Sequence, residues 1–296
     1  MDESQGGKAG MTRAELVAEL IALLDVEQTG ERRFRGMRKR GGVGRVYGGQ
    51  VVAQALAAAV KTVDPGRAVH SLHCYFLRGG DEDHEIEYRV EADFDGGSFS
   101  NRRVVASQQD RVIFNLAASF HRAEPGHAHQ PDMPDVPPPE ELPTIRDYLK
   151  AHPGEEPRLA PRLYRSASPI EVRFIGVPPF LEHGPIEPSL SLWFRAVAPV
   201  EAPQWMHRAL VAYASDFTMI TTALRPHRRF DVQAASLDHS LWFHDDADAG
   251  DWLLYTTESP WTGKARGLSF GHIFNRSGRL VASAAQEGLI RDRDLK

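Results

Sequence analysis

The stretch LVAYASDFTMITTAL, residues 210–224, decides how the rest of the chain is interpreted. Its residues are almost all apolar or small, which predicts a helix packed on most of its sides rather than one lying on a surface. Asp216 lies in the middle of this stretch. Because an unpaired carboxylate is costly to bury, we expect Asp216 to have polar partners, a chemical task, or both.

A related stretch occurs 160 residues earlier in the chain. GGQVVAQAL, residues 48–56, aligns with RALVAYASD, residues 208–216. Further along, RVIFNLAASF, residues 111–120, aligns with RLVASAAQEG, residues 279–288, at an offset of 168. Since the matches keep the same order in both halves, we interpret the chain as two copies of one folding unit.

Each copy has the same order of elements, an apolar helix followed by strands. The helices are predicted over residues 49–60 and 209–224, and their small side chains let strands approach closely. We therefore predict an α+β fold in which an antiparallel sheet curls around one helix, made twice in the chain. An additional amphipathic helix, RAELVAELIALLDV, is predicted at residues 13–26.

A proline-rich segment separates the two copies. Ten of the 20 prolines lie in residues 124–161, a composition that suits an extended connector better than a core. The predicted boundaries are residues 1–122 for the first unit with its leading helix, 123–165 for the connector and 166–296 for the second unit.

Composition and charge exclude several classes of function. The chain has 296 residues, 42% of them hydrophobic, as in a soluble globular protein. Its net charge of −5 gives no general attraction for nucleic acid. No apolar run approaches the roughly 18 residues that span a bilayer, so no stable membrane insertion is expected. The polar start MDESQGGKAGM gives no sign of a secretion signal, and the single Cys74 excludes an internal disulfide.

Three aligned positions differ in chemical kind between the copies. Copy one has apolar residues there, whereas copy two has a carboxylate, a hydroxyl and a carboxamide. The pairs are Leu56 and Asp216, Val69 and Ser236, and Ala118 and Gln286. A carboxylate can take a proton from water, and a hydroxyl and an amide can hold that water in place. The alternative is a satisfied polar cluster that only stabilises the second unit.

Copy one has a feature that copy two lacks. VYGGQVV places Gly48, Gly49 and Gln50 at the start of the first helix, where copy two has Arg208 and Ala209. Glycines let a ligand approach the backbone, and the N–H groups of a helix start can bind a developing oxyanion. Gly49 and Gln50 are therefore candidates for polarising a substrate carbonyl. The alternative is that the glycines serve only helix–strand packing.

Seven motifs, taken together, point to one family. They are RVYGGQVVAQAL, VHSLHCYFLRGGD, DGGSFSNRRV, ALVAYASDF, LDHSLWFH, WLLYTTESPWTGKARG and LVASAAQEGLIR. The chain resembles the acyl-CoA thioesterase II family, the TesB-like enzymes, from about Phe34 to Arg291, and the similarity weakens in the connector. This resemblance implies a double hotdog fold, which agrees with the duplication.

The resemblance also implies an activity. It is hydrolysis of medium- to long-chain fatty acyl-CoA to a free acid and coenzyme A. The catalytic Asp and Gln of the family match Asp216 and Gln286, and Ser236 stands where the family commonly has Thr. Acyl-CoA is the expected partner, with no cofactor and no metal. We also expect a homo-oligomer, either a dimer or a tetramer, in the cytoplasm.

The expected mechanism has Asp216 drawing a proton from a water that Ser236 and Gln286 hold. Direct attack by the carboxylate, giving a mixed anhydride, is the alternative chemistry. Two other functions stay open. A hotdog enoyl-CoA hydratase uses an Asp and a His five residues apart, but Thr221 follows Asp216 at that spacing. A non-catalytic acyl-CoA-binding protein would be expected to lose the polar triple, which this chain keeps.

Further residues are weaker candidates. Arg78, Arg102 and His239 lie in or near the family motifs and are candidates for binding substrate. His239 lies close to Ser236 in sequence, so its alternative role is to support the site without touching substrate. A strand arginine is often solvated and a strand histidine is often packed. GLSFG around Ser269 matches the G-x-S-x-G pattern of serine hydrolases. That mechanism needs an Asp and then a His downstream, whereas the last histidine of the chain is His272, so we reject it.

Overall fold

The computed structural model describes residues 10–39, 44–152, 168–182, 184, 186–227 and 232–293. The elements of the N-terminal half are α1 (Arg13–Leu24), β1 (Val26–Gly30), β2 (Arg33–Gly36), α2 (Gly48–Val60), β3 (Ala68–Phe76), β4 (Ile86–Asp95), β5 (Phe99–Gln108) and β6 (Arg111–His121). A short 3-10 helix, η2 (Pro139–Glu141), and the helix α3 (Ile145–Ala151) lie between the halves.

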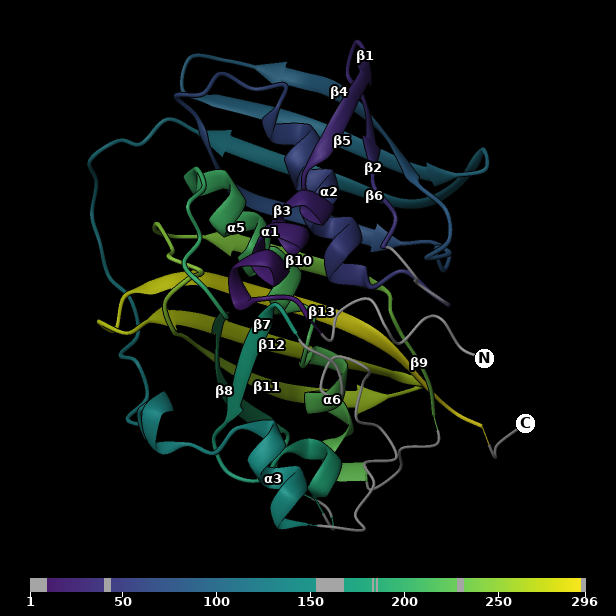
Figure 1. The fold of residues 1–296 in the computed structure, drawn as a ribbon. Coiled ribbons are helices and arrows are strands. Elements are labelled where there is room, and N and C mark those ends of the chain that lie inside the picture. The colour runs from purple at the N-terminus through teal and green to yellow at the C-terminus, as the bar shows by residue number, and fades with distance from the viewer. Residues whose placement is uncertain are drawn as a thin grey trace.

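The C-terminal half repeats the pattern of an apolar helix and strands. Its elements are β7 (Ile170–Phe174), η3 (Pro179–Leu181), β8 (Ser189–Ala196), α5 (Gln204–Ser215), α6 (Met219–Leu224), η4 (Arg225–His227), β9 (Val232–Ser236), β10 (Asp238–Phe243), β11 (Leu253–Gly263), β12 (Arg266–Asn275) and β13 (Leu280–Asp292). The strands form one sheet in the order β1-β2-β4-β5-β6-β3-β10-β13-β12-β11-β8-β7, and β9 pairs with β13. Each half of the chain therefore forms one part of the sheet (Figure 1).

The two halves join through β3 and β10, which pair antiparallel. His73 lies directly opposite Ser240, and these residues are 167 apart in sequence, the offset at which the two strands align. Corresponding residues of two copies can lie opposite each other only on a twofold axis. A pseudo-twofold axis therefore passes through this pair, and the predicted double hotdog fold is confirmed.

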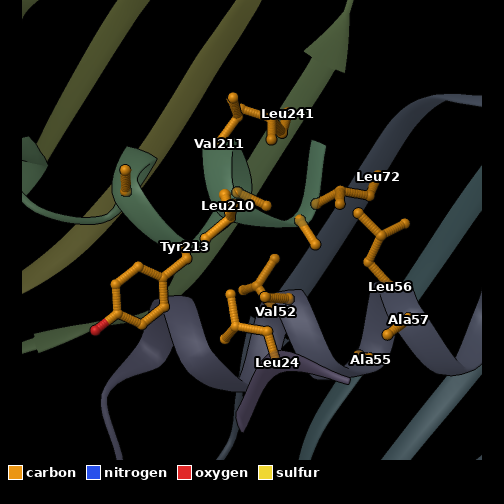
Figure 2. Close-up of a cluster of buried hydrophobic side chains, with 14 of the residues drawn as sticks. Leu24, Val52, Ala55, Leu56, Ala57, Leu72, Leu210, Val211, Tyr213 and Leu241 are labelled. Atoms are coloured by element: carbon orange, nitrogen blue, oxygen red, sulfur yellow. The ribbon is translucent and has the colours of Figure 1, made fainter. Parts of the chain in front are cut away.

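The helices α2 and α5 lie against each other inside the sheet. Every residue from Gly49 to Ala59 of α2 is buried, as is every residue from Met206 to Ser215 of α5. One hydrophobic core runs through both halves, and Figure 2 shows Leu56 of the first half in the same cluster as Leu210 and Leu241 of the second. None of the described helices combines the length and the hydrophobicity that crossing a bilayer requires.

The helix of the second copy differs from the prediction. The sequence predicts one helix over residues 209–224, whereas α5 ends at Ser215 and α6 begins at Met219. The hydroxyl of Tyr255 donates at 2.7 Å to the backbone carbonyl of Ser215, the carbonyl that a further helical turn would use as its acceptor. Neither Gly nor Pro marks this break, and Tyr255 lies 40 positions away in sequence.

The described part of the connector, residues 123–152, contacts the C-terminal half. The indole N–H of Trp193 donates to the carbonyl of Pro137 at 3.0 Å. Arg173 donates to the carbonyls of Pro139 and Leu142 at 3.0 and 2.8 Å. These bonds hold the extended segment and η2 in place, whereas the boundaries of the connector stay a prediction.

The start of α2 touches the end of α5 at Gly49. A Cβ atom on Gly49 would lie 2.3 Å from the carbonyl oxygen of Tyr213 and 2.5 Å from Cε1 of Tyr47. The hydroxyl of Tyr47 donates to the same Tyr213 carbonyl at 2.8 Å, which fixes both residues. Glycine is required here because the two helices approach too closely for any side chain.

Substituting Gly49→Ala should lower the free energy of unfolding by about 1–3 kcal/mol, because the added methyl group overlaps a backbone oxygen that cannot turn away. Thermal unfolding followed by circular dichroism measures the change. Gly126→Ala is the control, because a Cβ atom at Gly126 meets nothing within 4 Å. Equal melting temperatures for the two variants would show that the helices do not need this close contact.

Candidate active site

Asp216 is the C-cap residue of α5 and faces the start of α2. Its two carboxylate oxygens accept hydrogen bonds from opposite halves of the chain. Oδ2 accepts from the backbone N–H of Gly49 at 3.1 Å, and Oδ1 accepts from the hydroxyl of Ser236 at 3.1 Å. Asp216 and Ser236 are both partly exposed as whole residues, and the carboxylate of Asp216 is shared between the two units.

Strand register brings Ser236 and Gln286 together. Ser236 ends β9 and lies opposite Gly288 of β13, and Gln286 lies two residues earlier on the same face of that strand. The amide nitrogen Nε2 of Gln286 donates to Oγ of Ser236 at 3.1 Å. The three polar residues that distinguish copy two from copy one therefore meet in one place, although β9 and β13 are about 50 residues apart in sequence.

Two more residues extend this group into the core. Nδ1 of His239 lies 2.6 Å from Oε1 of Gln286, and Nε2 of His239 lies 2.8 Å from the hydroxyl of Ser215. Both His239 and Ser215 are 0% exposed. Asp216, Ser236, Gln286, His239 and Ser215 form one hydrogen-bonded row, called here the polar cluster.

Opposing effects set the ionisation of Asp216. Burial raises the pKa of Asp216 above its ordinary value of 3.8, and burial outweighs the nearby His239 and the hydrogen bonds from Gln286, Ser236 and Gly49, which lower it. The C-terminal end of α5 also disfavours a negative charge, whereas the start of α2 favours one. A carboxylate whose pKa is raised is a stronger base than a solvated one, which suits removal of a proton from water.

The corresponding place in copy one is apolar. Leu56, Val69 and Ala118 are 0%, 3% and 1% exposed and belong to the hydrophobic core. Arg208, which aligns with Gly48, donates to the backbone carbonyl of Val69 at 3.1 Å. Copy two therefore has the charged side chain of Arg208 at the position where copy one has Gly48, which has no side chain. Within the described residues the polar cluster belongs to one copy alone.

The hydrogen bonds at the start of α2 differ from the prediction that Gly49 and Gln50 polarise a substrate carbonyl. The N–H of Gly49 donates to Asp216, and the N–H of Gln50 donates to the carbonyl of Tyr47 at 3.1 Å. Each N–H has one hydrogen, so neither is free to polarise a substrate carbonyl. Among the described residues, none accepts a hydrogen bond from the N–H of Gly48. Gly48 is partly exposed, and a Cβ atom there would lie 2.7 Å from Oδ2 of Asp216.

Arg102 also differs from its prediction. It is 3% exposed, and its guanidinium donates to Thr62, to Asp95 and to backbone carbonyls. A guanidinium whose nitrogens all have partners offers no donor to a phosphate. Thr62 follows the C-terminal end of α2, roughly 20 Å along the helix axis from the end that meets Asp216. Arg102 therefore ties α2 to the sheet rather than binding substrate.

Arg78 and His239 have different surroundings. Arg78 is exposed and follows β3, two residues after Phe76, whose ring would lie 3.2 Å from a Cβ atom on Gly48. It stays a candidate for binding the coenzyme A end of a substrate. His239 is fully buried and bonds to Gln286, so its predicted contact with substrate is corrected to a contact within the polar cluster.

The sequence analysis named His239 as a possible support for the site but did not single out Ser215. At the offset of 167, His239 aligns with Leu72, and at the offset of 160, Ser215 aligns with Ala55. Both positions therefore change from apolar to polar between the copies, as the three earlier positions do. The same comparison of aligned residues could have found them.

Two family models match the chain. Residues 38–121 match the one described as the acyl-CoA thioesterase N-terminal domain, and residues 133–290 match the acyl-CoA thioesterase C-terminal domain. The two matches together span most of the sequence. The chain therefore belongs to the acyl-CoA thioesterase family, a family of thioester hydrolases built on the double hotdog fold.

Several relatives show the same relationship over their full length. Acyl-coenzyme A thioesterase 8 of Homo sapiens is 40% identical over 98% of this chain and 95% of its own. Acyl-CoA thioesterase 2 of Haemophilus influenzae is 36% identical over 94% and 99%. The crystal structure of acyl-CoA thioesterase II TesB2 from Mycobacterium marinum is 38% identical, with a TM-score of 0.76 over 93% of this chain and 99% of that one.

The stability of Asp216→Asn relative to the unchanged protein should rise with pH. Because the folded-state pKa of Asp216 is raised above 3.8, the folded state holds this proton more tightly than the unfolded state. The stability that this group contributes is therefore lost as the pH rises through the folded-state pKa, and asparagine has no such proton to lose. Urea unfolding of both proteins at about pH 5 and about pH 8 measures the difference. If the free energy of unfolding of Asp216→Asn instead fell relative to that of the unchanged protein as the pH rose, a raised pKa of Asp216 would be contradicted.

Proposed function

We propose that the protein hydrolyses medium- to long-chain fatty acyl-CoA to a free fatty acid and coenzyme A. The observation that carries this proposal is the Asp216 carboxylate, held by one hydrogen bond from each half at a partly exposed place. Membership of the acyl-CoA thioesterase family supports the substrate class. The chain-length range rests on the family resemblance alone.

Asp216 acts as the general base in the proposed reaction. It takes a proton from a water that Ser236 and Gln286 position, and the hydroxide attacks the thioester carbonyl carbon. The tetrahedral intermediate collapses as the C–S bond breaks, and the proton on Asp216 passes to the departing sulfur. The products are the fatty acid and coenzyme A thiol. A thiolate leaves readily, so no second acid is required.

The carbonyl oxygen needs a hydrogen-bond donor as negative charge develops on it. We assign this role to the N–H of Gly48, because the N–H groups of Gly49 and Gln50 have partners within the protein. Gly48 is the first residue of α2, so the positive end of the helix dipole supports the same oxyanion. One such donor is typically worth about 3 kcal/mol of barrier lowering.

The proposal also covers coenzyme A binding, assembly and cellular location. Arg78, exposed beyond Phe76, is the residue to which we assign a contact with coenzyme A phosphates. Assembly into a homo-oligomer is proposed from the family resemblance, and a cytoplasmic location is proposed from the composition, with its single cysteine. Enoyl-CoA hydration is disfavoured because Thr221 stands where that chemistry needs a histidine.

Asp216→Asn should reduce thiol release from palmitoyl-CoA by about 10²- to 10⁴-fold, because the amide cannot accept the proton of water. Gln286→Ala should reduce it by at least about tenfold, because the water loses a positioning group. A thiol reagent follows the reaction, and circular dichroism checks that both variants are folded.

Asp238→Asn is the matched control. Asp238 is a half-buried carboxylate on β10 that accepts from the N–H of Glu287 and lies outside the polar cluster. This variant should keep its activity within about threefold of the unchanged protein. Absence of thiol release by the folded, unchanged protein with every acyl chain length would reject the proposed function.

The pH dependence of kcat/KM should show an acid limb. Activity should fall as Asp216 takes up a proton, and the apparent pKa of this limb should lie above 3.8 because burial raises the pKa of Asp216. Rates at low substrate concentration, measured from about pH 4 to about pH 8, determine the limb. An acid limb at or below the ordinary pKa of an aspartate would contradict the role of this carboxylate.

A further inference from the structure

The donor and the acceptor of each hydrogen bond in the polar cluster can be assigned one after another, starting from Asp216. An ionised carboxylate only accepts hydrogen bonds, so the hydroxyl of Ser236 donates its single hydrogen to Oδ1. Oγ of Ser236 then has to accept from Gln286, which places the NH₂ group of that amide toward Ser236. Oε1 of Gln286 consequently faces His239.

The same reasoning fixes the tautomer of His239. Because an amide oxygen only accepts, Nδ1 of His239 has to carry a hydrogen and donate it to Gln286 at 2.6 Å. Burial lowers the pKa of His239, which favours the neutral ring. Nε2 is then without a hydrogen. The single hydrogen of the Ser215 hydroxyl has two acceptors within reach, Nε2 at 2.8 Å and the carbonyl oxygen of Ala212 at 2.9 Å, and it has to turn to Nε2 so that two acceptors do not face each other.

Comparison of the copies shows that the fold itself does not need these two residues. Leu72 stands in copy one where His239 stands in copy two, and both are 0% exposed. Ala55 likewise stands where Ser215 stands, and again both are 0% exposed. Leu72 lies opposite Ala118 in the β3–β6 ladder, so an apolar pair occupies the position of the bond between His239 and Gln286.

We propose that His239 is a positioning residue for the proposed thioester hydrolysis, its Nδ1–H holding the Gln286 amide in the one orientation that directs NH₂ toward Ser236. Ser215 selects the required tautomer by donating to Nε2. This inference rests on the proposed function. It assigns His239 no contact with substrate or with the reacting water.

Loss of the Nδ1–H would act through Gln286. If the amide turned over, its carbonyl oxygen would face Oγ of Ser236, whose hydrogen is already bonded to Asp216. Two acceptors would then face each other without a hydrogen between them, and the water would lose its amide donor. The chemical step should slow, whereas substrate binding should change little.

Three substitutions of His239 test which ring nitrogen matters for the positioning role. Asn carries its amide nitrogen where histidine has Nδ1, Gln carries it where histidine has Nε2, and Leu reproduces the residue of copy one. His239→Leu and His239→Gln should each lower kcat by about 10- to 100-fold, the range seen when outer partners of metal ligands are removed. KM should stay within about threefold. His239→Asn should recover most of the lost kcat, because it restores the donor to Gln286.

A second measurement determines the tautomer in the unchanged protein itself. In the unchanged protein labelled with ¹⁵N-histidine, long-range ¹H–¹⁵N correlation spectra should show a neutral histidine protonated at Nδ1. Its signals should be missing in the spectrum of His239→Asn. Ser215→Ala removes the donor to Nε2 and should shift this histidine toward the Nε2–H tautomer, with a loss in kcat of about threefold or more.

The outcomes separate this inference from the proposed function. If the unchanged protein releases no thiol, the proposed function fails, and the spectra still report the tautomer. If it releases thiol while His239→Leu keeps full kcat, or while His239→Asn is no better than His239→Gln, the positioning role is overturned. A histidine found protonated at Nε2 in the unchanged protein would overturn it as well.

Discussion

The hydrogen bond from the backbone N–H of Gly49 to the carboxylate of Asp216 is the constraint on which the rest of the structure depends. It joins residues 167 apart, one from each half, and it can form only where the start of α2 meets the end of α5. That meeting requires glycine at position 49, because a side chain would overlap the backbone of Tyr213. The bond therefore links the packing of α2 against α5 to the ionisation of Asp216.

Duplication explains how this chain accommodates a buried polar cluster. Buried polar groups cost stability unless each has a partner, and three of the five residues of the polar cluster in copy two, Ser215, His239 and Gln286, are buried. Copy one has apolar residues at all five aligned positions and shares its core with copy two through α2 and α5. Both copies contribute to the shared core, and the copy with the polar cluster is the one to which we assign the proposed reaction. The pseudo-twofold axis at His73 and Ser240 keeps the two in register.

Much of this could be predicted from residues alone. Matching stretches at constant offsets indicated the duplication, and the aligned differences singled out Asp216, Ser236 and Gln286. Other features could not be predicted, because they depend on partners remote in sequence. The carbonyl of Ser215, where α5 ends, accepts from a hydroxyl on β11, and the acceptors that saturate Arg102 include Thr62, just after α2, and Asp95 of β4. Neither partner leaves a local signal in the sequence.

The sequence by itself determined that two similar units exist, that their helices are enclosed, and that one unit has polar residues where the other is apolar. These properties follow from hydrophobic pattern and side-chain size, which are local. Only the tertiary structure decided that Gly49 holds Asp216, that the N–H of Gly48 has no acceptor among the described residues, and that His239 contacts Gln286. Hydrogen bonds depend on distance and direction, which strand register and helix contact set together.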